Sequence, residues 1–254
     1  MTLPESPPPA LRPTLDEGER QQIRRVVGPA ADALLRPLRD ARGRQFERLE
    51  FVGDSVLDLV LSVHCEVEPS CLGCRAVDGH VTRLVTDARL GREARGEGLG
   101  EWLEWAASDD RLADLVEACA AVSFMSGSWS QVVDFVSRVV HRLGDETEMV
   151  LRAGRGVDAA PARRAVGSAI LELAAALTVF SRLPDVDEGV LSTHRAELHR
   201  VSRVAHNARR RQMVDGHGTD AAVSDRVEEA LARLLLRAGA DTALQEAIDV
   251  LVDQ

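Results

Sequence analysis

The stretch from Phe46 to Leu61, FERLEFVGDSVLDLVL, constrains the fold of this chain most strongly, because its residue types repeat with the period of an α-helix. Its carboxylates are Glu47, Glu50, Asp54 and Asp58, and spacings of three, four and four residues align them along one helix face. The apolar residues that fall largely on the other faces are Leu49, Val52, Val56, Leu59 and Val60. We therefore predict a helix with one side buried and an acidic stripe.

The acidic stripe has two interpretations. Like charges at this spacing each cost a few tenths of a kcal/mol in an isolated helix, so the stripe contributes nothing to folding by itself. It is either a solvated acidic face, which charge runs usually are, or a site whose repulsion a bound divalent cation removes.

Two segments of the chain carry a family resemblance. Residues 47–55, ERLEFVGDS, closely resemble the signature segment of the ribonuclease III family, metal-dependent endonucleases that cut double-stranded RNA. Residues 113–118, ADLVEA, resemble that family's second acidic segment and follow in the same order. The resemblance implies four catalytic and metal-binding carboxylates, namely Glu50, Asp54, Asp114 and Glu117. Mg²⁺ or Mn²⁺ would be the cofactor, because hard oxygen ligands match these cations.

The remaining helix predictions give an all-α fold. Helical spacing recurs over residues 81–95, 112–124 and 131–143, and a pair of short helices is predicted within 16–44. A final helix is predicted over 241–254. No stretch alternates between polar and apolar residues as strands do.

The second half of the chain looks like a copy of the first. A shift of 114 residues places residues 52–57, VGDSVL, on 166–171, VGSAIL. The other matches pair 90–95 with 204–209 and, after a three-residue change of register, 114–118 with 225–229.

From this repeat we predict two tandem ribonuclease III-like domains. The proposed division is a disordered tail over 1–14, a domain with an intact acidic site over 15–153, and a degenerate domain over 154–254. The resemblance implies that such domains work in pairs. Two domains in one chain are expected to form that pair internally as a pseudo-dimer, favoured by effective concentration, and a homodimer through the first copies is the alternative.

The second copy lacks part of the acidic site. Arg164 and Ser168 stand where the first copy has its first two catalytic carboxylates, whereas Asp225 and Glu228 keep their spacing. An arginine at a ligand position puts a fixed positive charge where a cation would sit, so we expect the catalytic metal only in the first copy.

Binding of RNA needs positive charge, and the net charge of the chain is −10. Arg209, Arg210 and Arg211 form the densest basic run and are predicted to contact RNA phosphates. The alternative is an exposed helix end whose cations favour the C-terminal dipole. The double-stranded-RNA-binding domain that many family members append is not evident over 241–254.

A group of cysteines follows the signature stretch. Cys65, Cys71, Cys74 and His80 have the residue types of a structural Zn²⁺ site, with His64 as a competing ligand. Ordinary reduced thiols are the alternative. Elsewhere, Cys119 is predicted to be buried.

Two further expectations concern the tryptophans and the location of the protein. Trp102, Trp105 and Trp129 are predicted in the core or at a domain interface, because aromatic residues are so few. The longest apolar runs are far short of a membrane span and the N-terminus lacks the basic-then-apolar order of a signal peptide, so a cytoplasmic protein without membrane contact is expected.

The sequence thus predicts a metal-dependent endoribonuclease that hydrolyses double-stranded or hairpin RNA and, as the resemblance implies, leaves a 5'-phosphate and a 3'-hydroxyl. The alternative is a non-catalytic module of the same fold that binds structured RNA or a protein partner. A third interpretation is a metal-dependent hydrolase that acts on another phosphate substrate.

Overall fold

The computed structural model of the 254-residue chain describes residues 44–67, 86–97, 99, 108–126, 129–140 and 160–252. Within these ranges all regular structure is helical and there is no strand, which confirms the predicted all-α class. The helices are α3 (Arg44–Val67), α5 (Asp87–Gly96), α6 (Asp109–Ser126), α7 (Trp129–Val140), α9 (Ala160–Arg182), α10 (Glu188–Leu198), α11 (Val201–Arg211), α12 (Asp220–Ala238) and α13 (Ala240–Val252). The predicted tail over 1–14 and the helix pair after it lie outside the described residues.

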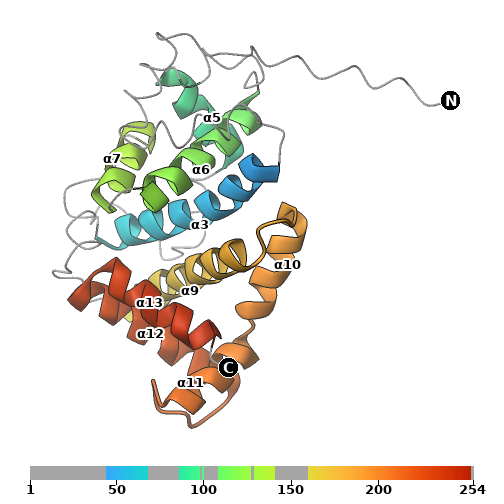
Figure 1. The fold of residues 1–254 in the computed structure, drawn as a ribbon. Coiled ribbons are helices and arrows are strands. Elements are labelled where there is room, and N and C mark those ends of the chain that lie inside the picture. Colours follow the sequence, from blue (N-terminus) through green and yellow to red (C-terminus); the bar gives the residue numbers. More distant parts are fainter. Residues whose placement is uncertain are drawn as a thin grey trace.

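The helices form two groups that follow the order of the chain. Figure 1 shows α3, α5, α6 and α7 in one group and α9 to α13 in the other, with α3 and α9 along the junction. In the first group α3 packs mainly on α6, and α6 packs on α5 and α7. The residues that fill this packing include Val52, Val56, Leu90, Leu115 and Phe135, all fully buried. The apolar face predicted for the signature stretch is therefore the face that α3 buries.

A close helix crossing at a glycine occurs at matching positions of the two groups. Gly53 of α3 lies so near α6 that a Cβ atom there would be 1.8 Å from the backbone oxygen of Glu117. Gly167 of α9 lies equally near α12, where a Cβ atom would be 2.1 Å from the backbone oxygen of Glu228. These are the residues that the 114-residue shift and its change of register pair with each other.

A second contact also occurs in both groups. Arg95, at the end of α5, pairs with Asp109 at the start of α6, with 2.8 Å between guanidinium and carboxylate. Arg209 of α11 pairs with Asp220 at the start of α12 at 2.6 Å. The short helix of each group is thus attached to the long acidic helix by an Arg–Asp pair at matching positions.

Arg48, which is only 4% exposed, lies at the junction between the two groups. Its guanidinium donates hydrogen bonds to the carbonyl oxygens of Phe180, Leu183 and Val186, at 2.6, 2.5 and 3.3 Å. It also lies 4.6 Å from the centre of the Phe180 ring. These carbonyls stand at and just beyond the end of α9, where a helix leaves acceptors unsatisfied and favours a cation. One side chain of α3 therefore caps the central helix of the other group.

Two burial predictions are confirmed and two fall outside the described residues. Cys119 is fully buried in α6, and burial raises the pKa of its thiol. Trp129 is 6% exposed, and its indole nitrogen donates to the Asp241 carboxylate at the start of α13, at 3.1 Å, so it joins the two helix groups. Trp102 and Trp105 are not among the described residues.

One described helix is long and apolar enough to cross a membrane by length and composition, contrary to the estimate from apolar runs. It is the Arg163–Arg182 part of α9, and 61% of the apolar window is buried within the fold. Packing of α9 against α3, α12 and α13 accounts for its apolar character, as in the core helix of a globular protein.

The glycine at the closest helix crossing gives a direct test of the fold. Gly53→Ala is expected to lower the free energy of unfolding by about 3 kcal/mol or more, because the added methyl group would overlap the α6 backbone. Gly96→Ala is the matched control, since nothing lies within 4 Å of a Cβ atom there. Urea unfolding of both variants measures the difference, and equal stabilities would contradict the close approach of α3 and α6.

Candidate metal centre

The acidic residues of the first group meet because α3 and α6 cross where both helices carry carboxylates. Glu50 and Asp54 lie one turn apart on α3, and Asp114 and Glu117 lie one turn apart on α6. The absence of a side chain at Gly53 lets the two backbones approach at this level. Side chains from two different helices therefore converge on one small volume.

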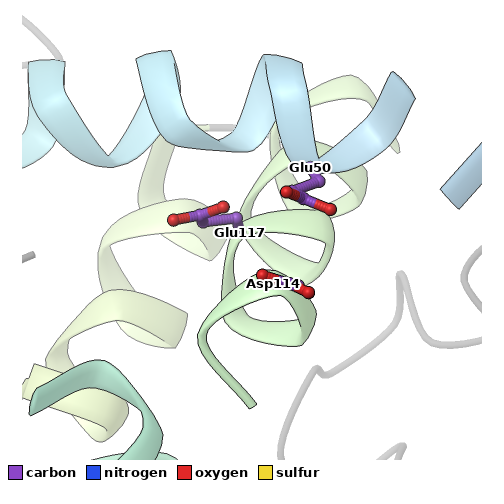
Figure 2. Close-up of side chains that lie close together, drawn as sticks. All are labelled: Glu50, Asp114 and Glu117. Carbon is purple, nitrogen blue, oxygen red and sulfur yellow. The ribbon is translucent and has the colours of Figure 1, made fainter. Parts of the chain in front are cut away.

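Three of the four predicted carboxylates form a group with the spacing of metal ligands. Glu50, Asp114 and Glu117 each offer one oxygen atom, and these atoms lie within 4.8 Å of one another. Figure 2 shows the Glu50 side chain extending from α3 toward the side chains of Asp114 and Glu117 on α6. All three residues are partly buried. A set of hard oxygen donors at this spacing suits a divalent cation that keeps some of its water ligands.

Burial and mutual repulsion make this group electrostatically unfavourable without a cation. Burial, with the Asp54 and Glu50 charges adding to it, raises the pKa of Glu117 to about 9. Burial, followed by the charges of Asp114 and Glu188, raises the pKa of Glu50 to about 8. The pKa of Asp114 is also raised, chiefly by burial, although the guanidinium of Arg111 at 3.0 Å opposes the shift. The raised pKa values favour the protonated forms of Glu50 and Glu117 at neutral pH. A divalent cation that bound here would displace these protons.

Asp54 lies beside this group but has a different partner. Its charge contributes to the raised pKa of Glu117, which places it near the cluster. Its carboxylate oxygen Oδ2 is 3.3 Å from Nη1 of Arg195, a residue of α10 in the second helix group. The structure thus brings together three of the predicted carboxylates, whereas the fourth forms an ion pair with an arginine.

Two residues of α10 that were not among the predicted site residues reach this centre. Arg195 is the first. Glu188, at the start of α10, is the second, and its pKa is raised by burial and then by the nearby charges of Glu47, Asp114 and Asp54. Both residues lie within the stretch 181–198, and no periodic pattern relates them to the acidic residues of the first half of the chain.

The equivalent place in the second group holds an ion pair. Nη1 of Arg164 lies 2.7 Å from Oδ2 of Asp225, joining α9 to α12. Arg164 and Asp225 are the residues paired by sequence with Glu50 and Asp114. A guanidinium of the chain itself thus neutralises the carboxylate here.

The predicted RNA-binding arginines are largely engaged within the second group. Arg209 donates to the carbonyl oxygens of Gly216 and Gly218 besides its pair with Asp220. Arg211 lies 3.4 Å from the carboxylate of Asp249 and 4.0 Å from that of Glu246. The exposed Arg210 stands between them in α11. Arg209 therefore organises the loop before α12, and contact of these residues with RNA stays a prediction.

The predicted zinc ligands fall mostly outside the described residues. Cys71, Cys74 and His80 belong to the range 68–85, and Cys65 is described only as part of the α3 backbone. His64, the competing ligand, is buried in α3 at 3% exposure. The zinc site and the reduced thiols both remain predictions.

The fold and site together define an all-α protein with a cluster of three carboxylates that could hold a divalent cation. No protein-family model matches the chain, and comparison with curated proteins gives no significant match. The ribonuclease III resemblance therefore stands on the two sequence segments quoted above.

Proposed function

We propose that the protein is a metal-dependent endoribonuclease that hydrolyses phosphodiester bonds in double-stranded or hairpin RNA. The observation that carries the proposal is the convergence of Glu50, Asp114 and Glu117, since they come from the two segments that resemble the ribonuclease III family. Chance resemblance of two separate segments would not require their carboxylates to meet in space. By the same resemblance, the products would carry a 5'-phosphate and a 3'-hydroxyl.

The chemistry follows from the ligand set. A bound Mg²⁺ would supply a water of lowered pKa and compensation for the negative charge of the reacting phosphate. The chain would contribute Glu50, Asp114 and Glu117 as oxygen ligands, on two helices that approach closely at Gly53. Rigid helices hold such ligands more accurately than loops do.

The second helix group is proposed to be a degenerate copy of the first. The proposal is supported by the two glycine crossings, at Gly53 and Gly167, and by the two Arg–Asp pairs that attach α5 to α6 and α11 to α12. Because the guanidinium of Arg164 forms an ion pair with the Asp225 carboxylate, this copy would hold no catalytic cation.

An internal pair of the two copies is favoured over a homodimer. The buried Arg48 and the Trp129–Asp241 hydrogen bond already join the groups within one chain. An internal pair with a single functional site would cut one strand of a duplex per encounter, whereas two chains joined through their first copies would cut both.

The test is cleavage of a duplex RNA labelled separately on each strand, in Mg²⁺. The native protein and Glu228→Gln are expected to nick one strand, while Glu117→Gln is expected to lose activity by several orders of magnitude. Glu228 is the matched control because it occupies the equivalent place in the second copy. Cleavage that survives Glu117→Gln would overturn the assignment of the site.

The alternative function is a non-catalytic module that binds structured RNA or a protein partner. The net charge of −10 favours the form that binds a protein partner, because binding of RNA needs positive charge at the phosphate backbone. RNA binding without cleavage at any Mg²⁺ or Mn²⁺ concentration would support the module. Turnover of single nucleotides in place of duplex RNA would indicate a hydrolase of another phosphate substrate.

A further inference from the structure

The guanidinium of Arg195 is a fixed cation placed against the candidate metal centre by the second helix group. Its Nη1 atom lies 3.0 Å from the hydroxyl of Ser55, 3.3 Å from the carboxylate of Asp54 and 3.5 Å from that of Glu172. The guanidinium carbon is 4.9 Å from the centre of the Phe51 ring. Arg195 thus contacts α3 through Phe51, Asp54 and Ser55, and its own group through Glu172.

These contacts distinguish Arg195 from an ordinary surface ion pair. Its side chain is 20% exposed, and a guanidinium can bind several acceptors and stack on a ring while remaining charged. Moreover, α10 follows the turn after α9, whose carbonyl groups at Leu183 and Val186 are held by Arg48 of α3. The helices that carry Asp54 and Arg195 are therefore joined at a second point, and this contact limits how far the Arg195 guanidinium can move from Asp54.

Asp54 stands where two cations would compete for it. It lies one turn from Glu50 on α3, and its charge acts on Glu117, so a divalent cation held by these glutamates would attract it. In the structure its Oδ2 atom faces Arg195 instead. A carboxylate that pairs with a guanidinium has to give up that pair, at least in part, before it can enter the inner shell of a metal ion.

We propose that Arg195 is a positioning residue that holds Asp54 outside the inner coordination shell of a cation bound by Glu50, Asp114 and Glu117. This inference rests on the proposed cation site and deepens it. It gives the second helix group a role at the site of the first: it sets the number of carboxylate ligands and lowers the affinity for the cation.

The test is Mn²⁺ binding to the full-length chain, followed by electron paramagnetic resonance. Arg195→Gln is expected to tighten binding by about tenfold or more, because a positive charge is removed and a carboxylate is released. Asp54→Asn is expected to weaken binding at least about tenfold more in the Arg195→Gln background than in the native protein, since only there would Asp54 be a ligand. If Asp54→Asn changes the Mn²⁺ affinity equally in both backgrounds, Arg195 acts only through its charge and does not control ligation by Asp54. That result would overturn the proposal.

A second measurement does not depend on the folding of the Arg195 variants. Water ligands on bound Mn²⁺ can be counted by pulsed resonance in ¹⁷O-labelled water, and native protein and Asp54→Asn are expected to give the same number. A gain of water in Asp54→Asn would show that Asp54 is an inner-shell ligand in the native protein and would overturn the proposal.

Two control variants separate this proposal from the cation site on which it rests. Arg195→Lys keeps the positive charge and is expected to keep the native affinity within about threefold. Glu117→Gln identifies binding at the centre. If no variant binds Mn²⁺ in a manner that depends on Glu117, the proposed function fails together with this inference. If such binding is present but Arg195→Gln does not strengthen it, only this inference fails.

Discussion

In protein freed of divalent cations, the free energy of unfolding is expected to fall by several kcal/mol between pH 5.5 and pH 9. The cause is the buried acidic group, in which the pKa of Glu50 is raised to about 8 and that of Glu117 to about 9. A carboxyl whose pKa is higher in the folded protein than in the unfolded chain stabilises the fold fully below its unfolded pKa. That contribution disappears as the pH rises through the folded pKa, because the unfolded chain then releases its proton more readily.

Urea unfolding in a chelator, repeated across this pH range, measures the decline. Glu117→Gln is expected to remove the larger part of it and to raise stability at pH 9, since a neutral amide replaces the buried charge. Saturating Mg²⁺ should restore the free energy of unfolding of the native protein above pH 7, because it binds the folded state. It should have little effect on the stability of Glu117→Gln. The same substitution at Glu197, which pairs with Arg200 on the surface, is the control and should leave the decline in place. A pH-independent stability would contradict the burial of these carboxylates.

The second large effect is the creation of a cation site in the second helix group. Arg164→Glu combined with Ser168→Asp is expected to raise the number of tightly bound Mn²⁺ ions from about one to about two per chain. The double substitution removes the guanidinium that lies 2.7 Å from Asp225 and supplies the carboxylates found at Glu50 and Asp54 in the first group. The close crossing at Gly167 already brings α9 and α12 together as Gly53 does for α3 and α6.

Equilibrium dialysis against Mn²⁺ counts the ions. Arg164→Gln is the matched control, because it removes the cation without adding a ligand, and it should leave the count at about one. If the double variant is folded and still binds about one ion, the two helix crossings are not equivalent at the level of their side chains. The proposal that the second group is a degenerate copy would then lose its main structural support.

The sequence predicted local features of the first group well, because helix periodicity is a local signal. The stretch 46–61 and the stretch 112–124 are both helical, and α3 buries the apolar face that its spacing indicated. The meeting of Glu50, Asp114 and Glu117 followed from the family resemblance, which supplied long-range information that spacing alone does not contain.

The partner of Asp54 could not be predicted in the same way. Arg195 lies 141 residues further along the chain, and no periodic pattern relates two residues at that separation. Arg48 is a similar case, because its acceptors are carbonyl groups near the end of a distant helix and have no side-chain signature. Contacts of this kind depend on how the two helix groups dock, which only the tertiary structure shows.

The junction also limits how the gene could be divided. The guanidinium of Arg48 is buried among carbonyl groups of the other helix group, and it lies two residues before Glu50 on the same helix. A fragment carrying only the first group would lose these carbonyl acceptors and the Phe180 ring, and the guanidinium of Arg48 would be exposed to water on the helix that also carries Glu50. The two helix groups are thus not independent at this junction, and a gene division between them would remove contacts of α3, the helix that carries Glu50.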